Sequence, residues 1–214
     1  MAERNRGYFE AKNLFCLNLM SSPGSGKTTL LNILASLDRP TSGEVLLEGK
    51  NIVYLTEKEI SAFRRKNLGF VFQDFNLLDT FSLRDNIYLP LVLSGKNHKE
   101  YDALLEPIAK QLHITDILDK FPYEVSGGQK QRAAVARALI THPDILLADE
   151  PTGNLDRKNG EEIIDLLKLS NRNLEQTILL ITHDEKIALE ADRVITIEDG
   201  KIVGDQKRRE GYVE

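Results

Sequence analysis

Short apolar runs alternate with amphipathic segments over most of the chain. Runs with so few polar positions are typical of strands that are buried on both faces of a sheet. The alternation predicts an α/β fold, in which helices cover both faces of a mostly parallel sheet. The runs predicted as strands are 14–20, 43–47, 68–72, 145–149, 177–182, 193–197 and 201–203.

Between these runs, the apolar residues recur with the period of a helix. Helical periodicity continues from Ser82, an expected N-cap, to about Leu118 without an intervening strand, and Ser126 is expected to cap the helix that contains residues 133–139. We therefore predict a single domain over residues 1–214, with an inserted helical lobe at about 79–140. The other predicted helices are 27–37, 57–66, 101–112, 159–170 and 185–190.

Composition narrows the class of protein. The chain has 214 residues, 41% of them hydrophobic and 29% charged, which is typical of a globular protein. A net charge of -5 opposes a dedicated nucleic-acid binder. Cys16 has no second cysteine to pair with, and no apolar run reaches the 18 residues of a membrane span. These features predict a cytoplasmic protein that could serve a membrane only through a partner.

A glycine-rich loop separates the first predicted strand from the first predicted helix. It matches the phosphate-loop pattern G-x-x-x-x-G-K-[ST], except that Ser21 stands in place of the first glycine. The backbone N–H groups would hold phosphates, Lys27 would neutralise their charge, and the Thr28 hydroxyl would bind Mg²⁺. The alternative is a loop that only turns a strand into a helix. The predicted nucleotide-binding residues here are Ser22, Gly24, Ser25, Gly26, Lys27, Thr28 and Thr29.

Two carboxylates follow the apolar run 145–148 directly. Ligands of open α/β sheets bind at the carboxyl ends of the strands, where this pair is predicted to lie. Asp149 would hold the Mg²⁺ shell, and Glu150 would orient and deprotonate an attacking water. The alternative is an acidic N-cap pair for the next helix.

A second potential anion site is formed by Ser126-Gly127-Gly128-Gln129 at a predicted helix start. Helix N-termini with hydroxyl and glycine N–H groups bind anions. A capped helix without a ligand is the alternative, because serine is a common N-cap.

Five motifs together, in this order and spacing, resemble the nucleotide-binding subunits of ABC transporters. The resemblance covers about residues 30–204 and is strongest to the branch that serves lipoprotein release, macrolide export and peptide-antibiotic resistance. It implies an ATPase of the P-loop NTPase fold whose ATP hydrolysis powers transport. The motifs are 68–73, 125–132, 145–151, 153–156 and 182–184.

The resemblance also implies roles for single residues. Gln73 would touch Mg²⁺ and the attacking water, and His183 would contact the γ-phosphate. Asp156 would lie at a dimer seam. The other subunit's γ-phosphate would be bound by Ser126, Gly128 and Gln129.

The same resemblance implies partners. Two copies, or two paired nucleotide-binding subunits, would sandwich two ATP molecules head to tail. A separate transmembrane permease would hold the dimer at the inner face of the cell membrane.

The N-terminal part departs from this family. Only twenty residues precede Ser21, so two early strands of the usual antiparallel β subdomain and an adenine-stacking aromatic have no counterpart, and we expect that subdomain to be reduced to residues 43–52. The segment 18–31 instead resembles the phosphate loop of nickel-insertion GTPases of hydrogenase and urease maturation. A metal-inserting GTPase, or a P-loop chimera with impaired activity, is therefore the alternative. The GTPase is opposed by the lack of an Asn-Lys-x-Asp motif and of a second thiol.

Overall fold

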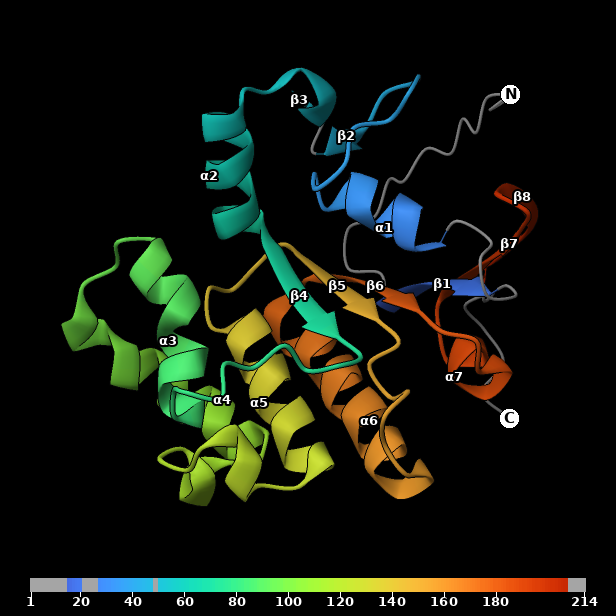
Figure 1. Cartoon of the computed structure of the whole chain (residues 1–214). Coiled ribbons are helices and arrows are strands. Elements are labelled where there is room, and N and C mark those ends of the chain that lie inside the picture. The colour runs from blue at the N-terminus through green and yellow to red at the C-terminus, as the bar shows by residue number, and fades with distance from the viewer. Residues whose placement is uncertain (1–14, 21–26, 48–49, 208–214) are drawn as a thin grey trace.

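The computed structural model describes residues 15–20, 27–47 and 50–207 (Figure 1). Within this part of the chain, a six-stranded sheet has the strand order β4-β5-β6-β1-β7-β8. All neighbours pair in parallel except β7 and β8, which are antiparallel. The strands of this sheet are β1 Phe15–Met20, β4 Leu68–Phe72, β5 Ile145–Asp149, β6 Thr177–Ile181, β7 Arg193–Glu198 and β8 Lys201–Lys207.

Seven α-helices and four short 3-10 turns connect the strands in the described residues. Ser82 caps α3 and Ser126 caps α5, as predicted, because each serine hydroxyl accepts the backbone N–H three residues later. The α-helices are α1 Lys27–Leu34, α2 Glu57–Asn67, α3 Leu83–Leu93, α4 Tyr101–Gln111, α5 Gly127–Leu139, α6 Arg157–Leu174 and α7 Glu185–Leu189. The 3-10 turns are Ile52–Tyr54, His98–Glu100, Thr115–Ile117 and Pro122–Glu124.

The central strands are buried on both faces, which explains their nearly unbroken apolar sequences. In β5, Leu146 and Ala148 belong to the apolar core beneath α5 and α6, whereas Leu147 belongs to the core beneath α1 and α2. In β6, Ile178 belongs to the core beneath α5 and α6, and Leu179 belongs to the core beneath α1 and α2. Figure 1 shows α1 and α2 on one side of the sheet, with α5 and α6 on the other.

Helix α5 packs closely against the edge strand β4. A Cβ added at Gly69 would lie 2.5 Å from the carbonyl oxygen of Ala138, so only glycine permits this approach. Buried residues of α3, α4 and α5 share one apolar core with the sheet residues Val71 and Leu146. We therefore propose that residues 79–140 are a helical lobe of the same domain as the sheet.

The antiparallel β subdomain is reduced, as predicted. A two-residue strand β2, Leu46–Leu47, pairs with β3, Lys50–Asn51, in place of the longer strand predicted at 43–47. Gly43 has φ +96, a conformation that interrupts an extended strand and that glycine adopts without strain. In the described residues, the paired part of this segment therefore begins at Leu46 and does not reach back to Gly43.

Candidate functional site

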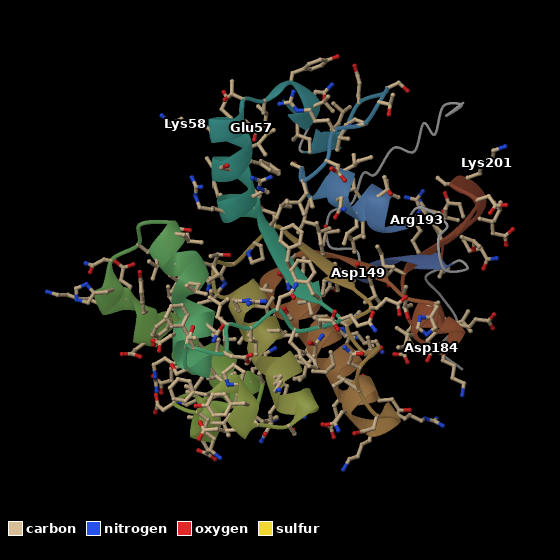
Figure 2. All side chains as sticks on the ribbon, viewed as in Figure 1. Glu57, Lys58, Asp149, Asp184, Arg193 and Lys201 are labelled. Atoms are coloured by element: carbon tan, nitrogen blue, oxygen red, sulfur yellow. The ribbon has the colours of Figure 1, made fainter. Side chains whose placement is uncertain are left out.

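The carboxyl ends of three neighbouring strands meet in register. Phe72 of β4 pairs with Asp149 of β5, and Asp149 pairs with Ile181 of β6. The next residues, Gln73 and Glu150, together with the segment 182–184, therefore lie along one edge of the sheet. Figure 2 shows Asp149 at the end of β5 and Asp184 at the start of α7. The fold thus brings parts of three sequence motifs, 68–73, 145–151 and 182–184, to the same edge.

The side chains of Glu150 and His183 are in contact at this edge. The distance between Glu150 Oε2 and His183 Nδ1 is 2.5 Å. The side chain of Glu150 is 20% exposed, whereas that of His183 is 68% exposed. Glu150 also has a positive φ of 46°, and its backbone N–H donates to the carbonyl oxygen of Ile181 at 2.9 Å. Such a conformation is uncommon for a residue with a side chain and often marks a functional position.

His183 lies beside a well-anchored turn. Thr182 is buried, and its hydroxyl accepts the backbone N–H of Asp184 at 3.1 Å. Asp184 in turn caps α7 through a hydrogen bond from the backbone N–H of Lys186. The backbone on both sides of His183 is therefore held while its imidazole stays exposed.

Gln73 is linked to the loop that follows β5. Its Nε2 donates to Asn154 Oδ1 at 3.3 Å, and Asn154 Nδ2 donates to the Gln73 carbonyl at 3.0 Å and to Asp74 Oδ1 at 2.9 Å. A Cβ added at Gly153 would lie 2.8 Å from Gln73 Nε2. Gly153 thus leaves the space that the Gln73 amide occupies.

The N-terminus of α5 is closed by a capping box. Ser126 Oγ accepts the backbone N–H of Gln129 at 3.3 Å, and Gln129 Oε1 accepts the backbone N–H of Ser126 at 2.9 Å. Gly128 is buried, and a Cβ there would lie 2.7 Å from Asn159 Oδ1. Ser126 and Gly127 are exposed. In the structure, Gln129 thus completes the cap of α5 and Gly128 packs against Asn159. The exposed helix start at Ser126 and Gly127 is open to a ligand.

Asp156 caps α6. Its Oδ1 accepts the backbone N–H of Asn159 at 3.0 Å, and its Oδ2 accepts the Asn159 side-chain amide at 2.5 Å. These hydrogen bonds, with the backbone one as the larger cause, hold the pKa of the Asp156 carboxyl below its ordinary value. The carboxylate is thus held by hydrogen bonds at the start of α6, beside the loop that contacts Gln73.

Most of the predicted phosphate loop lies outside the described residues, namely Ser22, Gly24, Ser25 and Gly26. The described backbone places Lys27, Thr28 and Thr29 in the first turn of α1. Because β1 lies between β6 and β7, the segment that joins its carboxyl end to α1 starts from the same edge of the sheet as Glu150.

The carboxylate and amide side chains at this edge are of kinds that can bind Mg²⁺. Across residues 15–20, 27–47 and 50–207, no group of three His, Cys, Asp or Glu side chains could hold a metal ion. Mg²⁺ usually binds to one or two carboxylates together with phosphate oxygens and water. Asp149, at the strand end, supplies one such carboxylate, and Gln73 follows the neighbouring strand.

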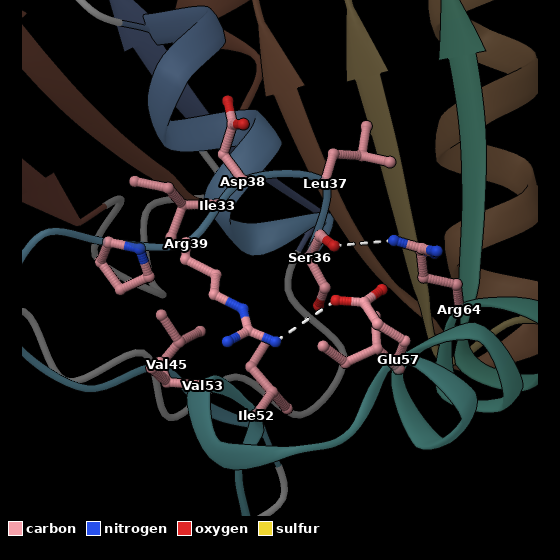
Figure 3. Close-up of a pocket in the computed structure, with 12 residues that line it drawn as sticks. Ile33, Ser36, Leu37, Asp38, Arg39, Val45, Ile52, Val53, Glu57 and Arg64 are labelled. Carbon is pink, nitrogen blue, oxygen red and sulfur yellow. Dashed lines mark hydrogen bonds and ion pairs between the residues drawn. The ribbon is translucent and has the colours of Figure 1, made fainter.

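A cavity of about 80 Å³ lies elsewhere, at the C-terminal end of α1 (Figure 3). Arg39 pairs with Glu57 at 3.3 Å beside it, and Arg64 donates to the carbonyl oxygen of Ser36 at 2.7 Å. The last residue of α1, Leu34, lies seven residues from Lys27, about 10.5 Å along the helix axis. The cavity is therefore distinct from the predicted phosphate site.

At the carboxyl edge of the sheet, one buried residue of the motif 125–132 was given no role of its own from the sequence. Gln131 lies on α5 and is fully buried, and its Nε2 donates to the carbonyl oxygen of Pro151 at 2.6 Å. The available signal was a polar residue on the apolar face of a helix, since Ala134, Val135 and Ala138 occupy the same face at helical spacing.

A mostly parallel sheet, a phosphate-loop sequence motif between its first strand and first helix, and acidic and amide side chains at its carboxyl edge are typical of P-loop nucleotide hydrolases. Comparison with known families is more specific, because the model of the ABC transporter family matches residues 9–153. The chain therefore belongs to the ABC transporter family, and it is an ATP-hydrolysing subunit that drives transport.

Relatives from several bacteria support this assignment. The uncharacterized ABC transporter ATP-binding protein YvcR of Bacillus subtilis is 50% identical over 192 residues, 90% of this chain and 74% of that protein. The bacitracin export ATP-binding protein BceA of Halalkalibacterium halodurans is 46% identical over 198 residues, 90% of this chain and 78% of that protein. The macrolide export ATP-binding/permease protein MacB of Rhodopirellula baltica is 43% identical over 92% of this chain, which corresponds to 29% of that protein.

A solved structure is similar over nearly the whole chain. It is a dimeric ATP-binding cassette in a post-hydrolysis state with bound ADP and Pi, 37% identical, with a TM-score of 0.84. The match covers 94% of this chain and 88% of that chain. Cassettes of this family thus bind nucleotide and form dimers, and the fold predicted from the sequence is confirmed.

Proposed function

We propose that this cassette hydrolyses Mg²⁺-bound ATP with Glu150 as the general base. The observation that carries the proposal is the 2.5 Å contact between Glu150 and His183 at the carboxyl edge of the sheet. A carboxylate at that edge can accept a proton from water, and the neighbouring imidazole can donate a hydrogen bond to a phosphate oxygen. Mg²⁺, when bound, would neutralise charge on the phosphates.

The other residues would position nucleotide and metal. Lys27 and Thr28, in the first turn of α1, would bind the phosphates and the metal, together with the loop before them. Asp149 would hold the metal shell, and Gln73 would reach the same region from β4. These assignments rest on the strand register and on the sequence motifs.

We also propose a head-to-tail dimer in which α5 of one subunit faces the nucleotide of the other. The start of α5 is exposed at Ser126 and Gly127, and a helix N-terminus favours an anion. The relative solved with ADP and Pi is described as dimeric, which supports this arrangement.

A membrane permease is the partner that we propose for the groove along β4. This groove, of about 360 Å³, lies beside the outermost strand of the described sheet, and its lining includes Phe70, Leu89 and Leu93. Leu93 is 69% exposed and Val92 is 56% exposed, which indicates an apolar surface that a partner could cover. In the described residues, no helix has both the length and the apolar character that crossing a membrane requires.

The principal test is Glu150→Gln in the purified chain. We expect ATP binding to persist and steady-state turnover to fall by roughly 10²- to 10⁴-fold, because the base is lost and the shape is kept. The matched control is Glu185→Gln, which changes an exposed glutamate in the first turn of α7 without touching His183. Unchanged turnover in Glu150→Gln would refute the assignment of the base.

The dimer is tested by specific activity. Turnover per chain should rise with protein concentration if two subunits complete each site. Ser126→Arg should keep ATP binding by the isolated chain and remove this rise, because a bulky cation would occupy the proposed seat of the other subunit's phosphate. Concentration-independent turnover in the unaltered chain would contradict the shared site. A parallel assay with GTP would detect the competing GTPase activity.

A further inference from the structure

Gln131 connects α5 to the chain segments at the carboxyl ends of β4 and β5. Its side chain is fully buried, and Nε2 donates to the carbonyl oxygen of Pro151 at 2.6 Å and to that of Phe72 at 3.4 Å. Pro151 directly follows Glu150, and Phe72 directly precedes Gln73. One amide nitrogen therefore contacts the two chain segments that carry the proposed base and the proposed metal-binding amide.

The orientation of this amide follows from its surroundings. Both neighbours are carbonyl oxygens, which only accept hydrogen bonds, so the NH₂ group has to face them. As a result, Gln131 Oε1 is buried without a hydrogen-bond partner. Among uncharged side chains of this length, only glutamine supplies two donors from one atom.

The contact acts on a strained turn. Glu150 has a positive φ, and its carbonyl oxygen accepts the backbone N–H of Gly153 at 3.0 Å, so residues 150–153 form a tight turn. Gln131 holds this turn from the inside by its bond to Pro151. The same helix begins after Ser126, about 7.5 Å from Gln131 along its axis.

From this geometry, we infer that Gln131 is a positioning residue for ATP hydrolysis: it sets Glu150 and Gln73 relative to the N-terminus of α5. The inference rests on the assignment of Glu150 proposed above. Without the two hydrogen bonds, the turn at 150–153 loses its internal support and the carboxylate moves from its place beside His183. Nucleotide binding, which involves α1, does not depend on this contact.

The first variant is Gln131→Met, which keeps the volume and removes both donors. We expect kcat to fall by roughly 10- to 100-fold with little change in KM for ATP, since a small misplacement of a catalytic group has this effect. The matched control is Gln176→Met, because Gln176 is also buried with an unpartnered Oε1 and donates to Ser170 Oγ away from the site. The control should lower Tm without lowering kcat in the folded protein.

The second variant is Gln131→Glu, which remains informative if the methionine variant does not fold. A protonated carboxyl donates to one carbonyl oxygen, and an ionised one donates to none. Burial raises the pKa of the introduced carboxyl, so turnover should be retained at low pH and fall as pH rises through that pKa. The ratio of variant to unaltered chain is measured at each pH, so that any pH dependence shared by the two proteins cancels.

The outcomes separate the two claims. A fall in kcat for Gln131→Met supports the inference. So does a turnover ratio of Gln131→Glu to the unaltered chain that changes with pH, provided that the matched control Gln176→Glu shows no such change. If Glu150→Gln is inactive while both Gln131 variants match the unaltered chain, the positioning role is refuted and the base assignment stands. If Glu150→Gln retains full turnover, the base assignment itself fails.

Discussion

The two halves of the carboxyl edge hold their side chains very differently. On the side of β4 and β5, Glu150 is 20% exposed and belongs to a turn that Gln131 holds by a hydrogen bond. On the same side, the Gln73 amide donates a hydrogen bond to Asn154. On the side of β6, the imidazole of His183 is 68% exposed although its backbone is anchored by Thr182.

This difference separates fixed groups from an adaptable one. A general base is most effective when its position is set before the reaction, because no reorganisation is then needed. A group that contacts the terminal phosphate gains from freedom to turn toward the nucleotide. We therefore expect changes on the β4–β5 side to act through geometry and changes at His183 to act through the loss of a single contact.

After Glu150→Gln, the largest effect is expected from His183→Ala. We predict that kcat falls by about 10²-fold, because the imidazole that contacts Glu150 is removed. Tm should stay unchanged, since the side chain is mostly exposed. Steady-state kinetics and thermal unfolding check this, with the exposed His98→Ala as control. A large loss of Tm would show that His183 is a structural residue, which would erase the contrast between the halves.

The next effect is expected from Gly153→Ala. The new Cβ would lie 2.8 Å from Gln73 Nε2, so the amide has to leave Asn154. We predict a fall in kcat of about 10-fold through displacement of Gln73. The measurement is kcat against KM for ATP at saturating Mg²⁺. A change confined to KM would mean that Gln73 acts in binding and that its position does not affect the chemical step.

A smaller effect, a gain in stability with no change in kcat, is expected from Gly160→Ala. This variant also serves as a control for Gly153→Ala. Gly160 lies inside α6, and an added Cβ would meet only ordinary contacts with Thr152 at 3.4 Å or more. Alanine in a helix interior should raise the free energy of unfolding by roughly 0.5–1 kcal/mol. Chemical denaturation measures this, and kcat should not change. A loss of stability would show that α6 cannot tolerate the methyl group.

The smallest effect is confined to acid pH. The pKa of Asp156 is lowered in the folded protein, so its stabilising effect is present above the unfolded pKa and is lost as pH falls through the folded pKa. Asp156→Asn keeps the N-cap and removes the titration. Unfolding curves from roughly pH 6 to pH 3 should therefore be less pH-dependent for the variant. An identical dependence would assign the acid sensitivity to other carboxylates.

Much of the fold could be predicted because its signals are local. The strands predicted at 68–72 and 145–149 match β4 and β5, since an apolar run of that length has few alternatives. The end of α6 was predicted at residue 170, but the helix continues to Leu174. It ends at Glu175 with φ 50°, where a glycine would have been the usual sequence signal.

The candidate site was predictable in part. Asp149-Glu150 were proposed because ligands of open α/β sheets bind at the carboxyl ends of the strands, whereas the role of Gln73 was implied by the resemblance to ABC subunits. The role of Gln131 was not found, since a single glutamine in a helix carries no information about which carbonyl oxygens it will meet. Its partners are 59 and 20 residues away in the chain.

The sequence by itself determined the class of the protein and the identity of its chemical groups, because strand runs, glycine loops and acidic strand ends are local patterns. Only the tertiary structure decided how these groups are held. Parallel register placed Gln73 and Glu150 along one edge, and the packing of α5 placed one amide between their strands. The physical reason is that hydrogen bonds between distant segments depend on where the whole sheet and its helices come to lie.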